Sequence, residues 1–394
     1  MKKLSIKDLD LREKRLFMRV DFNVPLNEGR VEDDSRIRAS MPTIDYALQR
    51  GARLVLASHL GRPKGTRNEK YSLGPVARHL QTFTAGRKVR FAQDCVGAEV
   101  EQAAGQLTAG EILVLENLRF HAEEEKNDDR FSAQLARLAD LYVNDAFGAA
   151  HRAHASTVGV VKVLGRGAAG LLMEREIDYL SLAIQNPERP ATAVFGGAKV
   201  SDKIETVENF IQIVENILIG GGMAYTFLKA KGKNIGKSLV EDDKLQVAVE
   251  VMERARSGGV NFLLPQDHVV AAELKPGIES RVVEEIPDGA IALDIGPKTV
   301  ELYASIVKQS GTVIWNGPMG VFETTPFERG TVAIARAMAE VHGLTIVGGG
   351  DSVAALNAAG VQDRIDHVST GGGASLEFLA GKKLPGVEVL TDRD

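Results

Sequence analysis

The chain of 394 residues is short of cysteine, aromatic residues and long apolar runs. Its one cysteine, Cys95, cannot form an internal disulfide, and aromatic residues make up only 5% of the sequence. We therefore expect a reducing compartment, of which the cytoplasm is the simplest. The opening segment MKKLSIKDLD lacks the apolar core of a secretory signal peptide, and no segment approaches the roughly 20 apolar residues of a membrane-spanning helix. We expect neither secretion nor a partner in the membrane.

A strong excess of charge of one sign is also missing. The formal net charge is -5, the isoelectric point is about 6.0, and no basic stretch is interleaved with aromatic residues. We therefore expect no nucleic-acid partner. The first 170 residues are net positive and the remainder is net negative, so the first half is better suited to bind an anion. Hydrophobic residues at 44% and charged residues at 26% are typical of a packed globular protein.

Apolar, β-branched runs recur along the chain and alternate with amphipathic helical patterns. Runs without inside/outside alternation are typical of parallel strands whose sheet is covered on both faces by helices. The runs form two series: RLFMRV (15–20), RLVLAS (53–58), EILVLE (111–116) and DLYVND (140–145), then TAVFGG (192–197), NILIGGG (216–222), VNFLLP (260–265), TVIWNG (312–317) and LTIVGGG (344–350). We predict an α/β fold with two Rossmann-like domains.

The two series are separated by one long helical pattern. LLMEREIDYLSLAIQNP (171–187) has helical spacing and ends at Asn186 and Pro187, so we interpret it as a connecting helix. This places one domain at 1–170 and the other at 188–380. The tail 381–394 is too short to be a domain and must pack on another part of the chain. A capping pattern at Thr325, Pro326 and Glu328 predicts a further helix start.

Two motifs suggest other activities. Gly165 to Gly170 spells GxGxxG before a helix, so an NAD(P)-dependent dehydrogenase is one alternative. However, the acidic residue expected at the end of the next strand is replaced by Gly196 and Gly197. Gly232 to Ser238 resembles a phosphate loop, but it has three residues between the glycines instead of four. We interpret it as a surface loop, and a non-catalytic nucleotide-binding regulator is the second alternative.

Polar residues gather at the strand ends of the first half. They occur in the segments RVDFNVP (19–25), SHLGRP (58–63), ENLRF (116–120) and HRAH (151–154), together with Arg36. Ligands of an open parallel sheet bind at the carboxyl ends of its strands, so these segments are expected to meet. The arginine fork binds phosphate or carboxylate through paired hydrogen bonds. This set of arginines and other polar residues indicates a small, doubly anionic substrate.

The strand ends of the second half are rich in glycine. They are GGAKVSDK (196–203), GGGM (220–223), NGPMG (316–320) and GGGDS (348–352). Glycine lets backbone N–H groups approach phosphate, and a helix that begins at Asp351 would direct its positive end to the same place. We interpret these segments as a nucleoside triphosphate site without a Walker loop. Asp351 is a suitable ligand for Mg²⁺, which prefers carboxylate and phosphate oxygens.

The same segments carry a family resemblance. RVDFNVP, SHLGRP, NLRF, AHRAHAS, GGAKVSDKI, WNGPMGVFE, GGGDS and STGGGASLE occur in this order over nearly the whole chain. The sequence thereby resembles the phosphoglycerate kinase family. The resemblance implies reversible phosphoryl transfer between 1,3-bisphosphoglycerate with MgADP and 3-phosphoglycerate with MgATP. It also implies a monomer whose carboxyl-terminal tail, 381–394, returns to the first domain.

The resemblance assigns residues to each substrate. The residues implied for phosphoglycerate are Asp21, Asn23, Arg36, His59, Arg62, Arg119 and Arg152. Those implied for ATP or ADP are Lys203, Gly296, Glu323, Gly349, Gly350, Asp351 and Ser352. Arg36, Lys199 and the helix start at Gly371, Gly372 and Gly373 would surround the transferred phosphoryl group. Because each domain would hold one substrate, we also expect hinge closure on binding.

Overall fold

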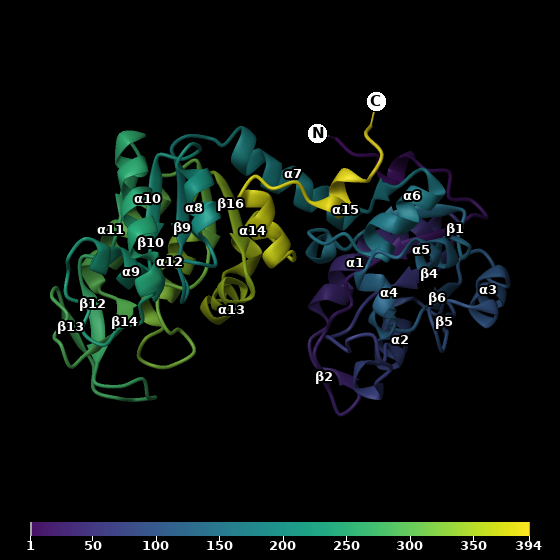
Figure 1. Cartoon of the computed structure of the whole chain (residues 1–394), viewed down its shortest axis with the longest axis horizontal. Helices are drawn as coiled ribbons and strands as arrows, with labels where there is room; N and C mark the ends of the chain where they lie inside the picture. The colour runs from purple at the N-terminus through teal and green to yellow at the C-terminus, as the bar shows by residue number, and fades with distance from the viewer. Residues whose placement is uncertain (1, 394) are drawn as a thin grey trace. The chain divides into compact units, whose positions relative to one another are not determined.

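The computed structural model describes residues 2–393, which fall into two compact units. The first unit comprises residues 1–177 and 383–394, and the second comprises 178–382. The division falls inside helix α7 (Leu171–Gln185), the helix predicted over 171–187 (Figure 1). Within the described residues no helix is long and apolar enough to cross a membrane.

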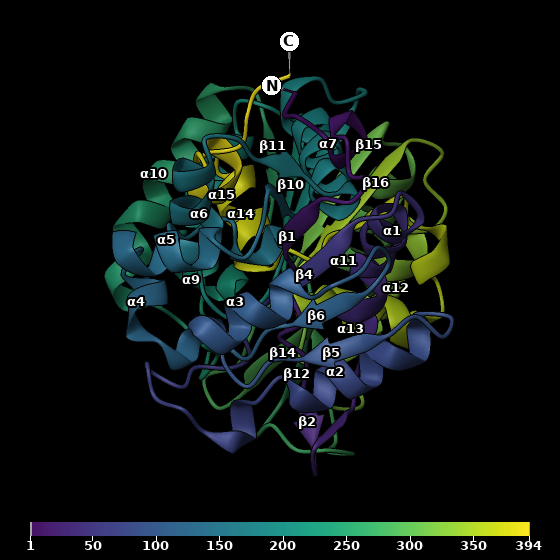
Figure 2. The same ribbon diagram turned by 90° about the vertical axis from the view of Figure 1, so that its right-hand side faces the viewer.

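The first unit is built on a six-stranded sheet in the order β5-β6-β4-β1-β7-β8, and every pairing in it is parallel. Figure 2 shows β1, β4, β6 and β5 following one another across this sheet. Its strands are β1 (Arg15–Arg19), β4 (Arg53–Ala57), β5 (Val89–Phe91), β6 (Ile112–Val114), β7 (Leu141–Asn144) and β8 (Ala168–Ala169). A short antiparallel hairpin, β2 (Leu26–Asn27) and β3 (Arg30–Val31), follows β1.

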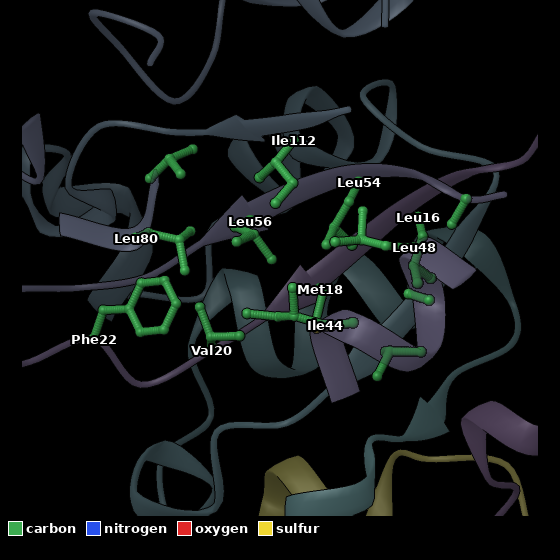
Figure 3. Close-up of a cluster of buried hydrophobic side chains, with 14 of the residues drawn as sticks. Leu16, Met18, Val20, Phe22, Ile44, Leu48, Leu54, Leu56, Leu80 and Ile112 are labelled. Atoms are coloured by element: carbon green, nitrogen blue, oxygen red, sulfur yellow. The ribbon is translucent and has the colours of Figure 1, made fainter. Parts of the chain in front are cut away.

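The core of the first unit forms because both faces of the sheet are apolar. Leu16 and Met18 of β1 and Leu54 of β4 face helix α1 (Ser35–Gln49), which contributes Ile44 and Leu48 (Figure 3). On the opposite face Phe17 stacks on Tyr142 of β7 with ring centroids 5.9 Å apart. Burial on both faces explains why these strands lack a polar/apolar alternation.

The second unit contains another six-stranded parallel sheet, in the order β11-β10-β9-β15-β16-β17. If the six strands of this sheet are numbered 1 to 6 in chain order, their order across the sheet is 3-2-1-4-5-6. This is the strand order of the dinucleotide-binding fold. The strands are β9 (Ala191–Phe195), β10 (Asn216–Ile219), β11 (Asn261–Leu263), β15 (Thr312–Asn316), β16 (Leu344–Gly348) and β17 (His367–Val368). The predicted α/β class with helix-covered parallel sheets is confirmed, although the first unit has a different strand order.

Helices cover both faces of the second sheet. Val194, Trp315 and Val347 belong to a buried cluster with α11 (Pro297–Lys308), α12 (Arg329–Met338) and α13 (Gly350–Ala359). The next residue of β9, Phe195, meets Phe210 of α8 (Ile204–Phe210) in an edge-on contact of 5.6 Å. The other helices of the chain are α2 (Gly74–Leu80), α3 (Ala98–Gly105), α4 (Ala122–Glu125), α5 (Asp129–Ala136), α6 (Val160–Leu164), α9 (Met223–Ala230), α10 (Leu245–Ser257), α14 (Gly373–Leu379) and α15 (Pro385–Glu388).

A three-stranded antiparallel sheet in the second unit was not predicted. Its order is β13-β12-β14, with β12 (His268–Ala271), β13 (Arg281–Val283) and β14 (Ile291–Ile295). These strands are short and mix polar with apolar residues, so their sequence pattern is weak. The predicted helix start at Thr325 is wrong, because α12 begins at Arg329 after a turn that contains a cis bond between Thr325 and Pro326.

The carboxyl-terminal tail belongs to the first unit. The side-chain ammonium of Lys3 donates to the Leu390 carbonyl at 3.0 Å and pairs with Asp392 at 2.8 Å. Asn144, at the end of β7, donates through Nδ2 to the Gly386 carbonyl at 3.2 Å. Residues from both ends of the chain thus complete one unit.

The GxGxxG segment does not have the structure of a dinucleotide fingerprint. The apolar run before it is helical, because α6 ends at Leu164 and Gly165 follows in the left-handed conformation. A fingerprint needs a strand at that point. Gly170 instead makes room for Asp145, whose carboxylate oxygen would lie 2.1 Å from an added Cβ. The dehydrogenase alternative required a strand before Gly165, and the structure has helix α6 there instead.

Candidate active site

The candidate anion site of the first unit lies where the order of its sheet reverses. The chain leaves β1 toward β4 on one side, while β7 and β8 lie on the other side of β1. Such a switch point leaves a crevice at the carboxyl ends of the two central strands. The loops after β1 and β7 carry Asp21, Asn23 and Arg152, which were assigned to phosphoglycerate from the sequence.

The loop after β1 is tied to the start of α1. Arg36 donates through Nη1 to Asp21 Oδ2 at 3.0 Å and to the Asn23 carbonyl at 3.2 Å. Asn23 in turn accepts through Oδ1 from the Gly61 N–H at 2.8 Å, which connects this loop to the one after β4. The Arg36 side chain is 38% exposed, so its remaining N–H groups can reach a ligand. The structure therefore brings three of the predicted residues into one hydrogen-bonded group.

His59 and Arg119 form the buried floor of this site. Arg119 donates through Nη1 to the Gly61 carbonyl at 2.9 Å, and its buried Nε forms an ion pair with Glu125 Oε1 at 3.4 Å. Burial lowers the pKa of Arg119 to about 10, and Arg19 and Arg152 add to this effect. Burial and the positive charges of Arg19, Arg119 and Arg36 hold the pKa of His59 well below its usual value. This concentration of positive charge favours an anion.

The loop after β7 adds a third group of donors. Arg152 donates through Nε to His151 Nε2 at 3.0 Å. His154 is buried and its Nδ1 has no hydrogen-bond partner among the described residues. Its pKa is lowered to about 3, first by burial and then by the charges of Arg19, Arg119 and Arg152. At neutral pH the imidazole is uncharged and is therefore a very weak base.

Arg19 lies at the centre of this cluster, although the sequence assigned it no role beyond its place in the segment RVDFNVP. It is fully buried at the end of β1 and donates through Nε to Ser156 Oγ at 2.8 Å, while its Nη2 lies 3.2 Å from His59 Nδ1. Glu124, also buried, accepts from the Ser156 N–H at 2.9 Å. A charged residue at the end of an otherwise apolar strand was the sequence signal that could have identified Arg19. Glu124 carried no such signal, because it lies in the run EEE (123–125).

Arg62 stands apart from the other predicted phosphoglycerate residues. It is exposed in the loop after β4, and within residues 2–393 its side chain makes no hydrogen bond or ion pair. In this geometry the charge of Arg62 can attract an anionic substrate from a distance. A direct contact between Arg62 and the substrate stays a prediction.

In the second unit, glycines let the strand-end turns touch one another. The Gly197 N–H donates to the Pro318 carbonyl at 2.8 Å, and the Met223 N–H donates to the Gly197 carbonyl at 3.0 Å. A Cβ at Gly196 would lie 2.0 Å from the Pro318 carbonyl oxygen, so no larger residue fits there. These turns follow β9, β10 and β15, and β9 and β15 flank the switch point of this sheet.

Lys203 reaches into this junction from the start of α8. Its ammonium donates to the Gly196 carbonyl at 2.7 Å and to the Asn316 carbonyl at 3.3 Å. Burial lowers the pKa of Lys203 to about 8, while the charges of Asp351 and Asp202 oppose this shift. A partly desolvated ammonium at the carboxyl edge of a parallel sheet is suited to phosphate oxygens.

The turn before α13 exposes a helix amino terminus. Gly349 has φ 92°, which favours glycine, and no side chain caps the first N–H groups of the ten-residue helix. Ser352 is buried and accepts through Oγ from the Gly317 N–H at 2.6 Å, so it holds the turn after β15. Asp351 is exposed on the first helical turn. An uncapped amino terminus is a ready site for phosphate, and the Asp351 carboxylate has the hard oxygen donors that Mg²⁺ prefers.

The predicted catalytic glycines lie beside this turn. Gly371 donates its N–H to Ser369 Oγ at 3.2 Å, and the Ser369 N–H donates to Val347 of β16 at 2.8 Å. Gly372 adopts φ 53° and ψ -115°, which requires glycine, and α14 begins at Gly373. Lys199 is exposed in the loop after β9, and its side chain makes no hydrogen bond or ion pair within the described residues.

Gly296 and Glu323 lie beyond the glycine-lined junction. Gly296 follows β14 as the N-cap of α11 and packs on Asp267, whose Cγ would lie 2.3 Å from an added Cβ. The first N–H groups of α11 are capped by the Asp267 carboxylate, which accepts from Thr299 N at 2.8 Å, so they are not free for phosphate. Glu323 is exposed in the loop after β15, where its carboxylate is accessible to a ligand hydroxyl.

Two α/β units, one with arginines and the other with glycines at the carboxyl edge of a parallel sheet, define a two-domain phosphotransferase. The family model described as "Phosphoglycerate kinase" matches residues 6–382. The chain belongs to the phosphoglycerate kinase family. It is therefore a kinase that uses ATP or ADP, and its place is in glycolysis.

Curated proteins and solved structures agree with this membership. Proteins named "Phosphoglycerate kinase" from Koribacter versatilis (strain Ellin345) and Moorella thermoacetica are 57% and 58% identical to the chain, with all of both chains covered. The structure of phosphoglycerate kinase from Coxiella burnetii is 40% identical and matches with a TM-score of 0.90, covering 98% of each chain. The crystal structure of the enzyme from Pyrococcus horikoshii OT3 is 32% identical, with a TM-score of 0.85 and the same coverage.

Proposed function

We propose that the chain catalyses reversible phosphoryl transfer between 1,3-bisphosphoglycerate with MgADP and 3-phosphoglycerate with MgATP. The observation that carries this proposal is the group of Arg36, His59, Arg119 and Arg152 at the switch point of the first sheet. The charges of Arg36 and Arg119 lower the pKa of His59, and the charge of Arg152 lowers the pKa of His154 and of Arg119. We assign this unit, 1–177 with the tail, to phosphoglycerate and the second unit to the nucleotide.

In this assignment the arginines and asparagine hold the anionic substrate. Arg119 binds the phosphate or carboxylate through its guanidinium group, while Arg36 is oriented by Asp21 and keeps exposed donors for the transferred group. His59 and His154 are uncharged donors at neutral pH because their pKa values are strongly lowered. The acceptor in this reaction is a carboxylate, which has no proton to remove, so the site needs no general base.

The second unit holds the nucleotide phosphates in the proposed function. Lys203 and the uncapped amino terminus of α13 contact phosphate oxygens, and Glu323 accepts from the ribose hydroxyls. Asp351 would hold Mg²⁺, which neutralises charge on the nucleotide phosphates when it is bound. Arg36, Lys199 and the turn of Gly371 to Gly373 stabilise charge on the phosphoryl group during transfer, where positioning and electrostatics provide most of the catalysis.

We further propose that the chain works as a cytoplasmic monomer without a nucleic-acid or membrane partner. The isoelectric point of about 6.0 supports the absence of a nucleic-acid partner, and the monomer rests on the resemblance to the family. Light scattering of the purified full chain measures the mass directly, and a dimeric mass would contradict the monomer.

A coupled assay tests the proposed reaction. The full chain is mixed with 3-phosphoglycerate and MgATP, and ADP release is followed through a pyruvate kinase and lactate dehydrogenase couple. We expect turnover that requires both substrates and falls sharply in Arg36→Ala. Binding of MgADP without turnover would instead support the nucleotide-binding regulator.

A further inference from the structure

The one cysteine of the chain lies beside an imidazole and a carboxylate, away from the proposed substrate contacts. Asp94 and Cys95 follow β5, and His121 follows the short turn after the neighbouring strand β6. One ligand atom of each residue lies within 4.8 Å of the other two. Within residues 2–393 this is the one such group of three histidine, cysteine or acidic side chains.

Contacts hold the three side chains in place. His121 Nε2 lies 2.7 Å from Asp94 Oδ1, and the His121 ring packs on Phe131 with ring centroids 5.1 Å apart. Asp94 Oδ1 also accepts from the Cys95 N–H at 2.6 Å. The fold therefore supplies the arrangement before any ligand binds, and little conformational entropy is lost when one does.

Burial makes the group closed on one side and open on the other. Cys95 is fully buried, whereas the side chains of His121 and Asp94 are 28% and 50% exposed. A small ion can enter from the side of the carboxylate, and water can complete its coordination there.

The charges around the thiol are suited to a cation. The Asp94 carboxylate lies beside the sulfur, within the 4.8 Å that separates the three ligand atoms. A carboxylate at that distance attracts a positive ion to the sulfur. A thiolate bound to a metal ion is stabilised by that ion.

We propose that Asp94, Cys95 and His121 bind one borderline-soft divalent cation of the zinc class, with water as the fourth ligand. Sulfur and imidazole ligands favour Zn²⁺ over Mg²⁺, so this site is separate from the nucleotide's metal. When the metal–sulfur bond forms, the Cys95 thiol releases its proton to solvent, and His121 binds as the neutral imidazole. The site does not depend on the proposed function of the chain.

Cobalt spectroscopy on the full-length, chelator-stripped protein tests the proposal. Co²⁺ replaces zinc and gives visible bands when tetrahedral, and a sulfur ligand adds a thiolate charge-transfer band in the near ultraviolet. Because Cys95 is the one cysteine of the chain, such a band can arise only from it. We expect both sets of bands to saturate at one Co²⁺ per chain and to disappear when Zn²⁺ is added.

Variants identify the other two ligands. His121→Gln and Asp94→Asn change partly exposed side chains, and circular dichroism shows whether each remains folded. Loss of the outer partner of a metal ligand costs about 10–100-fold in affinity, so loss of a ligand should cost at least that much. His79→Gln is the matched control, because His79 Nε2 pairs with Asp34 at 3.1 Å but has no cysteine beside it. The control should leave the titration unchanged.

Two results would overturn the proposal. One is the absence of a thiolate charge-transfer band in the wild-type chain. The other is a band whose affinity is the same in folded His121→Gln and Asp94→Asn as in the wild type. A fall in affinity in both variants, but not in His79→Gln, would establish the three-residue site.

Discussion

At the scale of single residues, a buried arginine shifts the pKa values of its neighbours in the first unit. Arg19 has no access to solvent, and its charge lowers the pKa values of His59, Arg119 and His154. Glu124 is the buried counter-charge, but burial raises the pKa of this carboxyl. The cluster therefore carries excess positive charge that an anionic substrate would neutralise.

Arg36 is the residue whose loss should separate catalysis from binding. In Arg36→Ala we expect kcat to fall about 10²–10³-fold, with a smaller change in KM, because its exposed donors stabilise charge that grows in the transition state. Steady-state kinetics with 3-phosphoglycerate and MgATP measure both constants. Glu32→Ala is the control, because Glu32 is an exposed carboxylate before α1 whose side chain makes no hydrogen bond or ion pair within residues 2–393. A raised KM with wild-type kcat would remove the catalytic role.

Lys203 should make nucleotide binding depend on pH. Its pKa of about 8 means that the ammonium loses its proton as the pH rises through that value. We expect the affinity for MgADP to fall over this range, because a neutral amine no longer attracts phosphate. Lys203→Arg keeps its charge, so its affinity should change less with pH. Calorimetric titrations of both proteins at several pH values measure the effect, and parallel profiles would contradict it.

At the scale of elements, the amino terminus of α7 depends on Asp145. This buried carboxylate accepts through Oδ1 from the N–H groups of Leu172 at 3.0 Å and Met173 at 3.3 Å. Gly170 is required just before the helix, because a Cβ there would collide with the same carboxylate. The helix that passes from one unit to the other therefore starts at a buried acid.

Burial raises the pKa of Asp145 from 3.8 to about 7, so the folded protein binds a proton more tightly than the unfolded chain does. Its contribution to the free energy of unfolding is fully present below about pH 4 and is lost as the pH rises to about 7. We expect the difference in stability between wild type and Asp145→Asn to change in that direction. The slope cannot exceed about 1.4 kcal/mol per pH unit.

Urea unfolding of both proteins at several pH values measures this difference. Asp128→Asn is the matched control, because Asp128 caps α5 through the Phe131 N–H at 2.8 Å but is only partly buried. A pH-independent difference for Asp145→Asn would show that the acid is not protonated in the folded state.

At the scale of the whole molecule, the candidate groups for the two substrates lie on separate compact units. Arg152→Ala and Arg62→Ala should therefore weaken binding of 3-phosphoglycerate and leave the affinity for MgADP within about twofold of wild type, since substitutions at sites that share no partner residues are usually independent. Calorimetry on the full chain measures both affinities. An equal loss of MgADP affinity would contradict the assignment of one substrate to each unit.

In-line transfer requires both substrates at one phosphorus atom, so we expect ligand-dependent hinge movement. Small-angle scattering on the full chain, alone, with 3-phosphoglycerate, with a non-transferable ATP analogue and with both, should show the smallest radius of gyration for the ternary sample. A radius that is the same in all four samples would contradict the hinge.

Local sequence was sufficient to predict the parallel strands and the connecting helix. The runs at 15–20, 53–58, 192–197 and 312–317 show no polar/apolar alternation because their strands are covered on both faces, and burial leaves a clear compositional trace. The helix pattern over 171–187 ends at a proline for an equally local reason. The family, and with it the reaction class, also followed from motifs that are contiguous in the chain.

Tertiary structure decided those features that depend on contacts between residues far apart in the sequence. The antiparallel strands β12 to β14 and the turn before α12 depend on partners that local patterns do not encode. The same applies to Glu124, which is one of three consecutive glutamates. It differs from the other two because it accepts a hydrogen bond from Ser156 and lies near the charge of Arg19. Sequence spacing shows which side chains can serve a site, whereas burial and charge, which set their pKa values and free donors, arise only when separate segments pack together.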